Sequence, residues 1–482
     1  MSSQSPADAT DLAGAIKAGK LSCVDAMQAS LAACATHQDL GAIAYLDAAM
    51  GLAAAQMMDR EASEHPERFA ARSFAGLPTI AKDLGGPFAG LPVAAGSRLL
   101  RREDTSQDSD IARRFRESGL CPFGLSTSPE FGFSLASEPS MGPICRNPLD
   151  PSRTAGGSSG GAAAAVAARI LPVAHASDGG GSIRIPASAS GVFGMKPTRA
   201  RNPCGPDRGE GWGGFSCGHV VSISVRDSAV MLDAVSGPEV SSPYQAPKPE
   251  RPFAEEVGRN PGRLRITFSD KSPYGDTIDP EISAAVRDVA GLLAKLGHEV
   301  EERAPVLSAD PGPAIGTIVG ANTALGVRQA EQRYGRAMTE RDFEILTLAH
   351  AHNAQQQNAV DYVSAQIDAF RIARGLAEFF ESCDVFLSPT LCTPPVRLGE
   401  INSMAADLSH IMPILRRYMP GTAMFNMSGQ PAMSMPLAWN KAGLPLGMMF
   451  AARSGGEATL FRMAAQLEQT RPWKNRLPPV CA

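Results

Sequence analysis

The sequence has no long apolar run, almost no excess of one charge sign and no closely spaced cysteine pair. Its most apolar stretch, residues 162–176, is interrupted by Arg169 and Pro172 and is shorter than the roughly 20 residues that a membrane-spanning helix needs. The 45 basic and 49 acidic side chains give a formal net charge of −4, which argues against a surface for nucleic acid. With 44% apolar and 20% charged residues, the 482-residue chain has the composition of one large or two to three ordinary globular domains.

The nine cysteines include no C-x-x-C spacing and are odd in number. This usage argues against a disulfide scaffold and against a zinc site. Residues 1–20 contain no basic segment followed by an apolar run, so a secretory signal is not expected. We therefore predict reduced, mostly buried thiols in a cytoplasmic protein.

Three further patterns are too weak to indicate a cofactor or a metal. The glycine runs lack the Gly-Lys-Ser/Thr ending of a phosphate-binding loop. Residues 209–214 fit G-x-G-x-x-G, but no strand precedes them and no helix follows, as a dinucleotide site requires. His350 and His352 are spaced so that their rings would lie on different faces of a helix. The prediction is that neither a cofactor nor a metal is used.

Short apolar segments alternate with helical ones, which predicts an α/β fold with a mainly parallel sheet and helices on both faces. Strands are predicted at residues 76–81, 119–125, 171–176, 191–195, 263–268, 298–302, 384–388, 431–439 and 444–451. Helices are predicted at residues 108–118, 162–168, 280–296 and 456–469, besides two or three in the first sixty residues.

The predicted organisation is a helical segment over residues 1–75, packed on a core that spans residues 76–482. Within that core, residues 310–382 are almost wholly helical in pattern and would form part of a wall or lid. Residues 240–262, rich in Pro and Ser, would be a surface connection.

Residues 156–160 fit G-x-S-x-G, the turn that carries the nucleophile of α/β-hydrolases. Such a turn must emerge from a strand, whereas residues 151–155 are not an apolar strand. A later acid and a histidine are also needed, and His410 is the last histidine in the chain. The order of residues permits this interpretation, but the preceding segment argues against it.

A second interpretation combines Lys82, at the end of an apolar strand, with Ser158 in GGSSGG and Ser182 in DGGGSIR, 24 residues later. A glycine triplet lets backbone N–H groups converge on one point, where an oxyanion would form if Ser182 attacked a carbonyl. Serine needs a base, and a buried lysine serves if its pKa falls by roughly 3 units from about 10.4. The simpler alternative is that the glycines form turns and Lys82 lies at the surface.

The sequence resembles the amidase signature family over nearly its whole length. The long Gly/Ser motif matches residues 156–187, and the lysine motif matches GLPTIAKDL at residues 76–84. Further matches in the family's order are PEFG (129–132), GMKPT (194–198), SVRD (224–227), FNMSGQPAMSMP (425–436) and GLPLGMMF (443–450).

The resemblance implies an α/β/α sandwich with a central mixed, mainly parallel, twisted sheet. It also implies that Ser182 is the acyl nucleophile, Ser158 a bridging serine after a cis peptide bond, and Lys82 the terminal base. The implied oxyanion hole consists of the backbone N–H groups of Gly179, Gly180, Gly181 and Ser182. The implied supporting residues are Ser159, Ser177, Asp178 and Arg184.

Two positions depart from the family pattern. The residue before Gly-Gly-Ser is often bulky in the family and is Gly179 here, which would enlarge the space beside the oxyanion hole. Leu125 stands where the strand before TSPEFG usually has a lysine. The predicted lining of the substrate pocket comes from the glycine-rich stretch 199–219 and from TSPEFG, and consists of Ser128, Trp212, Phe215 and Cys217.

The implied activity is hydrolysis of the C–N bond of a small or oligomeric amide, linear or cyclic, with water as the second reactant. The overall pattern is similar to that of 6-aminohexanoate cyclic dimer hydrolases; aryl-acylamidase, carbamate and ester hydrolases of the family stay as alternatives. Ile185 stands where transamidating subunits typically have Gln, which disfavours that role, and a non-catalytic scaffold would lack one of the three catalytic side chains. No nucleic-acid or membrane partner is expected, and a homodimer is left open.

Overall fold

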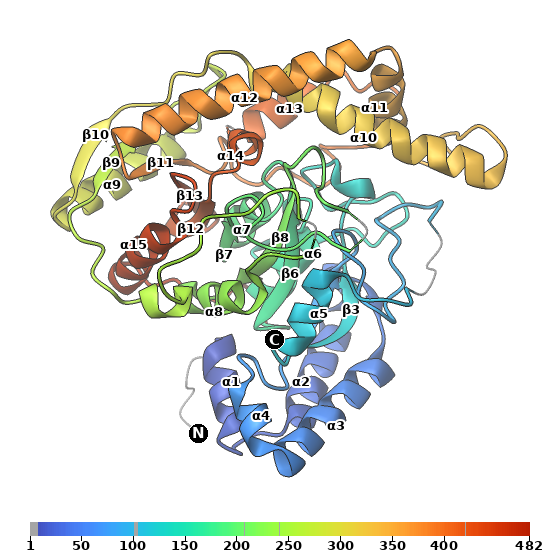
Figure 1. The fold of residues 1–482 in the computed structure, drawn as a ribbon, viewed down its shortest axis with the longest axis vertical. Coiled ribbons are helices and arrows are strands. Elements are labelled where there is room, and N and C mark those ends of the chain that lie inside the picture. Colours follow the sequence, from blue (N-terminus) through green and yellow to red (C-terminus); the bar gives the residue numbers. More distant parts are fainter. Residues whose placement is uncertain (1–7, 101–104, 207, 241, 420) are drawn as a thin grey trace.

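The computed structural model describes residues 8–100, 105–206, 208–240, 242–419 and 421–482. An eight-stranded sheet lies at the centre and helices flank it (Figure 1). Its strand order is β10-β9-β11-β13-β12-β7-β8-β6, with bounds β6 Val173–Asp178, β7 Phe193–Lys196, β8 Cys217–Ser222, β9 Arg265–Phe268, β10 Glu299–Glu302, β11 Val385–Pro389, β12 Ala432–Trp439 and β13 Pro445–Ala452.

The α/β fold with a mixed sheet is confirmed, but the expectation of a mainly parallel sheet is wrong. Of the seven neighbouring strand pairs, β10/β9 and β9/β11 are parallel and the other five are antiparallel. The strands β6 and β7 do run in the same direction, as a strand–helix–strand unit requires. However, β8 returns between them and is antiparallel to both. This strand begins within the glycine-rich stretch where no strand was predicted.

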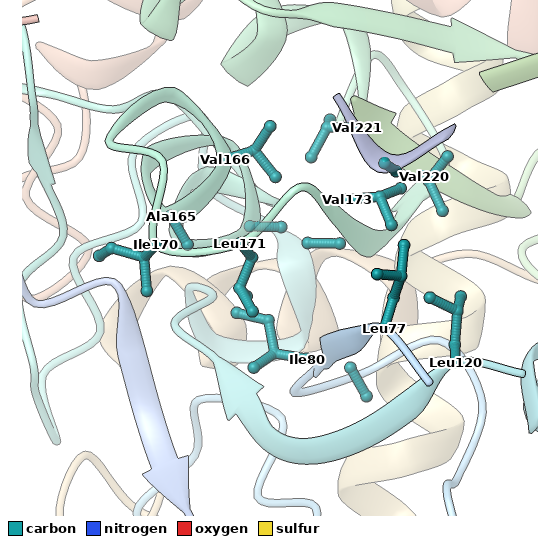
Figure 2. Packing of buried hydrophobic residues seen from close by; sticks show 14 of the residues in the cluster. Leu77, Ile80, Leu120, Ala165, Val166, Ile170, Leu171, Val173, Val220 and Val221 are labelled. Atoms are coloured by element: carbon teal, nitrogen blue, oxygen red, sulfur yellow. The ribbon is translucent and has the colours of Figure 1, made fainter. Parts of the chain in front are cut away.

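A three-stranded sheet continues beside β6 and carries the lysine motif. Its order is β1-β3-β2, with bounds β1 Ile43–Leu46, β2 Pro78–Lys82 and β3 Cys121–Ser126. The side chain of Thr79 on β2 donates a hydrogen bond of 2.9 Å to the carbonyl of Val173 on β6. Figure 2 shows Leu77 and Ile80 packed in one buried cluster with side chains of the neighbouring helix and of β6 and β8. This packing fixes β2 against the large sheet.

The helices cover both faces of the sheet, and N-terminal helices share the core of β2 and β3. The helices are α1 Ala9–Lys17, α2 Cys23–Thr36, α3 Ala48–Glu64, α4 Pro66–Ala71, α5 Asp110–Glu117, α6 Gly160–Ala167, α7 Arg184–Ser190, α8 Val225–Val235, α9 Pro280–Lys295, α10 Pro311–Tyr334, α11 Ile345–Gln355, α12 Ala359–Glu381, α13 Ile411–Tyr418, α14 Thr422–Ser428 and α15 Glu457–Thr470. The division at residue 75 stays a prediction.

Alternate side chains of each central strand enter different layers, as the two-residue period of a strand requires. On β13, Met448 and Phe450 belong to a cluster that also contains side chains of α8, α9 and α15. Met449 and Ala451 belong instead to a cluster with side chains of α10, α12 and α14. The near-continuous apolar sequence of β13 is therefore explained by burial on both faces.

Helices α10, α11 and α12 occupy the stretch that the sequence predicted to be helical. Asp310 accepts from the backbone of Gly312 and Pro311 takes the first helical position of α10, so the sequence itself signals this helix start. Asn358 and Asp361 form a reciprocal capping box at the start of α12. Figure 1 shows α12 along the outer edge of the molecule, on the opposite side from α3. Residues 253–256 and 130–132 form short 3₁₀ turns, and β4 (Arg146–Asn147) pairs with β5 (Asp150–Thr154).

Candidate active site

Lys82 ends β2, whose five residues are all buried, and its side chain is fully enclosed. Its ammonium nitrogen donates to the Ser158 hydroxyl at 2.8 Å and to the Ser177 hydroxyl at 3.0 Å. The backbone N–H of Lys82 donates to Nδ1 of His175 on β6 at 3.1 Å. The lysine is thus held by two neighbouring strands and is aimed at the loop that carries Ser158.

Burial lowers the pKa of Lys82 to about 7, because removal from water disfavours the charged ammonium; the negative charge of Asp178 opposes this effect. A substantial fraction of the amine is then neutral near pH 7. The sequence-based alternative of a surface lysine is wrong, because no part of this side chain reaches solvent.

Ser158 lies in the loop that leads into α6 and follows a cis peptide bond from Gly157. Its hydroxyl has room because residue 132 is glycine with φ +75°: a Cβ at that position would come within 3.0 Å of the Ser158 oxygen. The hydroxyl of Ser137 donates to the carbonyl of Gly156 at 3.0 Å and so holds the loop that carries Ser158 in place. The sequence assigned no role to Gly132 of the PEFG motif, although the absence of a side chain at this position is what gives the Ser158 hydroxyl its room.

Ser182 follows the turn after β6 and is 7% exposed. Its carbonyl accepts from the Ser159 N–H at 3.2 Å, so the two serine-bearing loops are joined directly. The Gly181 N–H donates to the Asp178 carboxylate at 2.7 Å. Gly181 was expected to supply an oxyanion donor, but its N–H is already engaged in this way. The remaining candidates for that role are the N–H groups of Gly179, Gly180 and Ser182.

A buried ion pair holds the turn between β6 and α7. Arg184 donates to both oxygens of Asp178 at 3.0 Å, and both side chains are fully buried. Burial alone would raise the pKa of Asp178, but the Arg184 guanidinium outweighs it and holds that pKa below its usual range. The Asp178 carboxylate also accepts from the N–H of Ile183 at 3.1 Å. Asp178 and Arg184 therefore shape the turn that presents Ser182.

Asn426 on α14 completes this network, although nothing in the sequence pattern indicated a role for it. Its amide nitrogen donates to the carboxylate of Asp178 at 2.8 Å and to the carbonyl of Phe215 at 3.0 Å, while its oxygen accepts from Arg184 at 2.7 Å. Thr422, four residues earlier, donates to the Gly180 carbonyl at 2.6 Å. Both residues lie beside or in the FNMSGQP motif, but only the fold brings α14 against the turn after β6.

We expect Asn426→Ala to destabilise the fold by about 2–4 kcal/mol, because it leaves buried charged partners with missing hydrogen bonds. It should also lower kcat more than it changes KM, since the turn before Ser182 loosens. Thermal unfolding and steady-state kinetics measure both effects. The matched control is Asn322→Ala, whose side chain bonds only within its own helix, to the Ile318 carbonyl at 2.8 Å; equal losses in the two variants would contradict the role of Asn426.

The geometry does not favour the histidine-dependent hydrolase turn. The Ser158 hydroxyl contacts Lys82 rather than an imidazole. The segment before Gly156 does form a strand, β5, but that strand pairs with β4 in a two-stranded sheet and makes one bridge to Arg397, so it lies outside the central sheet. His175 lies nearby, yet burial lowers its pKa to about 3, and its Nδ1 accepts the Lys82 backbone N–H. His175 therefore stays neutral and positions the lysine.

The comparison with protein families decides the class. A family model described as Amidase matches residues 25–461, which is most of the chain. The chain belongs to the amidase family. The match includes every residue of the Lys82, Ser158 and Ser182 arrangement.

Individual relatives of this amidase share both sequence and fold. A 6-aminohexanoate-cyclic-dimer hydrolase of Paenarthrobacter ureafaciens is 33% identical over 436 residues, which cover 87% of each chain. A putative amidase AmiC of Mycobacterium leprae (strain TN) is 35% identical over 471 residues, or 97% of this chain and 95% of that one. A solved structure of 6-aminohexanoate cyclic dimer hydrolase has a TM-score of 0.91 at 31% identity and covers 98% of this chain and 99% of that one.

The indole of Trp212 occupies the space beside Gly179 in this amidase. A Cβ on Gly179 would lie 2.6 Å from an indole carbon. The two residues meet because Asp178 pairs with Cys217, so the loop before β8 lies beside the turn after β6. The expectation that Gly179 enlarges the space by the oxyanion hole is therefore wrong: glycine is required there because the tryptophan of a different loop fills the volume.

We expect Gly179→Ala to be impaired and Gly179→Ala/Trp212→Gly to recover much of the lost activity. The added methyl group collides with the indole, and overpacking of this kind costs about 1–3 kcal/mol. Trp212 has φ 52°, a left-handed conformation that glycine adopts readily, so Trp212→Gly removes the ring without straining the backbone. Activity and unfolding temperature of the two single variants and the double variant measure the coupling; purely additive effects would contradict direct contact.

The other predicted pocket residues are more enclosed than Trp212. Phe215, Cys217 and Ser128 are 4%, 6% and 1% exposed. Phe133 stacks on Trp212 with 5.4 Å between ring centroids and 6° between planes, and His350 of α11 lies 5.6 Å from Phe133. Neither Phe133 nor His350 was predicted; His350 reaches this place only because the fold brings α11 beside the loop that follows PEFG. Together, Trp212, Phe133 and His350 form a stacked aromatic cluster beside Gly179.

Glu130 ties the loop of Phe133 to the helical insertion. One of its carboxylate oxygens accepts from the Glu344 N–H at 2.7 Å and from the Thr347 hydroxyl at 2.6 Å. Burial raises the pKa of Glu130 to about 7. The PEFG motif thus supplies both the glycine above Ser158 and the anchor of α11.

One cavity has a volume of about 660 Å³, and Ser182 is not among its lining residues. It is lined by the loops after β9 and β10 and by Met424 of α14. Thr422 and Asn426 point from α14 toward the turn that precedes Ser182, and Met424 lies on the other side of the helix, as a spacing of two requires. The cavity and the turn before Ser182 are therefore on different sides of α14.

Within the described residues, no group of three His, Cys, Asp or Glu side chains is arranged to hold a metal ion. The described helices also include none with the length and apolar character needed to cross a bilayer.

Proposed function

We propose that this amidase hydrolyses the C–N bond of a small or oligomeric amide through an acyl-enzyme on Ser182. As a member of the amidase family it is a hydrolase of carbon–nitrogen bonds other than peptide bonds. The observation that carries the mechanism is the 2.8 Å contact between the buried Lys82 amine and the Ser158 hydroxyl. The backbone N–H of Ser159, the residue after Ser158, donates to the carbonyl of Ser182 and so joins the two serine loops.

The neutral Lys82 amine accepts the proton of Ser158, and Ser158 in turn takes the proton of Ser182 as that oxygen attacks the amide carbon. The negative charge on the former carbonyl oxygen is stabilised by the N–H groups of the Gly179–Ser182 turn that Asp178 does not engage. The proton returns along the same path to the leaving nitrogen, and the C–N bond breaks. Water then attacks the ester of Ser182, which releases the carboxylic acid and restores the serine.

The proposed substrate has a flat or extended apolar part beside the reacting carbonyl. The support is the stacked aromatic cluster of Trp212, Phe133 and His350, whose indole lies directly beside Gly179 in the turn before Ser182. Two of the relatives reported above are named as cyclic dimer hydrolases, and a solved structure of that enzyme contains substrate. Linear and cyclic amides with aliphatic chains are therefore the first candidates.

Carbamates and esters are the alternative substrates, since the same serine chemistry cleaves them. A transamidating or scaffold role has less support, because Lys82, Ser158 and Ser182 are all present and Ile185 is buried next to the turn. Cytoplasmic location stays a prediction from cysteine usage.

The test is a panel of linear amides, cyclic amides, esters and carbamates, followed by release of amine or alcohol without added partner chains. We expect amine release from one of the amides and a transient mass increase on the peptide that contains Ser182. Ser182→Ala protein is the control. Turnover of esters only, or of carbamates only, would replace the amide proposal by that alternative.

A further inference from the structure

Residues 130–133 lie between the helical insertion and the serine loops, and successive residues of this segment have different neighbours. Glu130 accepts two hydrogen bonds from the start of α11. Gly132 lies so close to Ser158 that a Cβ at this glycine would come within 3.0 Å of the hydroxyl oxygen. Only one residue separates these two contacts, so a very short piece of backbone joins the start of α11 to the Ser158 hydroxyl.

The backbone of this segment has a conformation that depends on support from its neighbours. Phe131 has φ 48° and Gly132 has φ 75°, so two consecutive residues are left-handed. Glycine adopts this region freely, whereas phenylalanine does so at a cost and stays there only where its surroundings hold it. The N–H of Phe131 donates to the Ala95 carbonyl at 2.8 Å. The position of the glycine therefore depends on how firmly the residue before it is held.

The helical insertion holds the side chains of both residues that precede the glycine. The ring of Phe343 lies 5.6 Å from the ring of Phe131, measured between centroids. The next residue, Glu344, donates its N–H to Glu130 at 2.7 Å. Thr347, three residues further on, donates its hydroxyl to the same carboxylate oxygen at 2.6 Å. One short stretch of the insertion thus fixes the approach to the glycine.

We propose that Glu130 is a positioning residue, through which the start of α11 fixes the room that is available to the Ser158 hydroxyl. This inference rests on the proposed function, in which Ser158 passes the proton of Ser182 to Lys82. The Ser158 oxygen has to stay in contact with both partners, and its distance from the Lys82 amine is 2.8 Å. If the backbone of Gly132 moved toward Ser158, it would displace the hydroxyl from this contact.

The alternative is that Glu130 only stabilises the insertion. N–H groups at the start of a helix lack partners within the helix, and a carboxylate there is favourable whatever happens at Ser158. The two roles differ in what a loss of the contact changes. A purely stabilising contact alters the unfolding temperature but not the rate per folded molecule, whereas a positioning contact alters that rate. The test therefore compares two variants of similar stability.

Thr347→Val removes the hydroxyl that bonds to Glu130 and keeps the shape of the side chain. The readout is the rate at which methanesulfonyl fluoride sulfonylates Ser182 with loss of fluoride, followed by intact mass. This reagent has only a methyl group besides the reacting sulfonyl fluoride, so binding of a long substrate does not enter the measurement. We expect the rate to fall about tenfold, as a small displacement in an active site produces. Thr347→Ser restores the hydroxyl and should recover most of the rate.

Thr323→Val is the matched control. Thr323 is also a buried threonine of the insertion, but it lies on α10, and its hydroxyl donates to the Val319 carbonyl of the same helix at 2.9 Å. We expect this variant to be sulfonylated at the wild-type rate. A wild-type rate in Thr347→Val, or equal losses in the two valine variants, would overturn the proposal. Absence of labelling in wild-type protein would instead refute Ser182 as the nucleophile, and with it the proposed function.

Gly132→Ala tests the last step of the same path. The added methyl group meets the Ser158 hydroxyl, so we expect sulfonylation to be slower by at least about a hundredfold. The control is Gly275→Ala, which has nearly the same φ of 76°, whereas an added Cβ there meets no atom of the described residues within 4 Å beyond its chain neighbours. Equal rates in the two alanine variants would show that Ser158 does not depend on the room at residue 132, and would also overturn the proposal.

Discussion

Ser182→Ala should lower kcat by at least about a thousandfold while the fold is retained. The residues of a relay act as a unit, so removal of the attacking oxygen abolishes most of the chemical step rather than a share of it. Substrate binding should change little, because the alanine leaves the turn and its hydrogen bonds in place. The measurement is steady-state turnover of the best amide, together with the unfolding temperature.

Ser190→Ala is the matched control for this prediction. Ser190 is also buried and lies on α7, close in sequence to Ser182, but its hydroxyl bonds only to the Ala155 carbonyl at 3.3 Å. We expect this variant to keep kcat within a few fold of wild type. Near wild-type turnover by Ser182→Ala protein would remove Ser182 from the mechanism, whatever the control does.

Lys82→Met should be almost inactive, and the wild-type rate should rise with pH as Lys82 loses its proton. Only the neutral amine accepts a proton, and burial lowers its pKa to about 7. Wild-type kcat/KM should therefore increase about tenfold per pH unit below pH 7 and level off above it. Lys82→Met should lose this dependence in its residual activity. The range from about pH 5.5 to about pH 8 spans the pKa of Lys82. A wild-type rate that does not change across this range would exclude Lys82 as the titrating base.

The same substitution should stabilise the fold. The Lys82 pKa lies below its value of 10.5 in the unfolded chain, so between pH 7 and pH 10.5 the unfolded state binds the extra proton and stability rises with pH. The destabilisation is therefore complete below pH 7 and absent above pH 10.5. Below pH 7 this destabilisation is of order 5 kcal/mol from the pKa difference. Lys82→Met removes it, but the variant also loses the hydrogen bonds to Ser158 and Ser177, so the net gain in stability is smaller.

Lys196 is the matched control because it is equally buried. Burial lowers its pKa to about 8, and its amine bonds to the Pro197 carbonyl at 2.7 Å rather than to a serine. Lys196→Met should also gain stability at low pH. The kcat/KM of Lys196→Met protein should still rise with pH as in wild type, because Lys82 is intact. If both variants lost this pH dependence, the cause would be a general effect of buried charge and not proton transfer to Lys82.

Much of the fold could be predicted because single segments carry their own signals. The start of α10 is encoded by Asp310 and Pro311, and the hairpin of β12 and β13 by two apolar runs around residues 440–443. The predicted strand directions failed for a different reason: β8 lies in a stretch whose glycines and Trp212 conceal a strand, and its insertion between β6 and β7 is a tertiary choice. Local propensity contains no information about which strands become neighbours.

By itself, the sequence determined the residues of the proposed site: a lysine at a strand end, two serines in glycine loops, and an acid and an arginine near the second serine. The tertiary structure decided the rest. It set the Lys82 pKa, because desolvation depends on every atom packed around the amine. It placed Trp212 against Gly179 and Asn426 against Asp178, since contacts between residues far apart in the chain exist only after β8 and α14 have found their places.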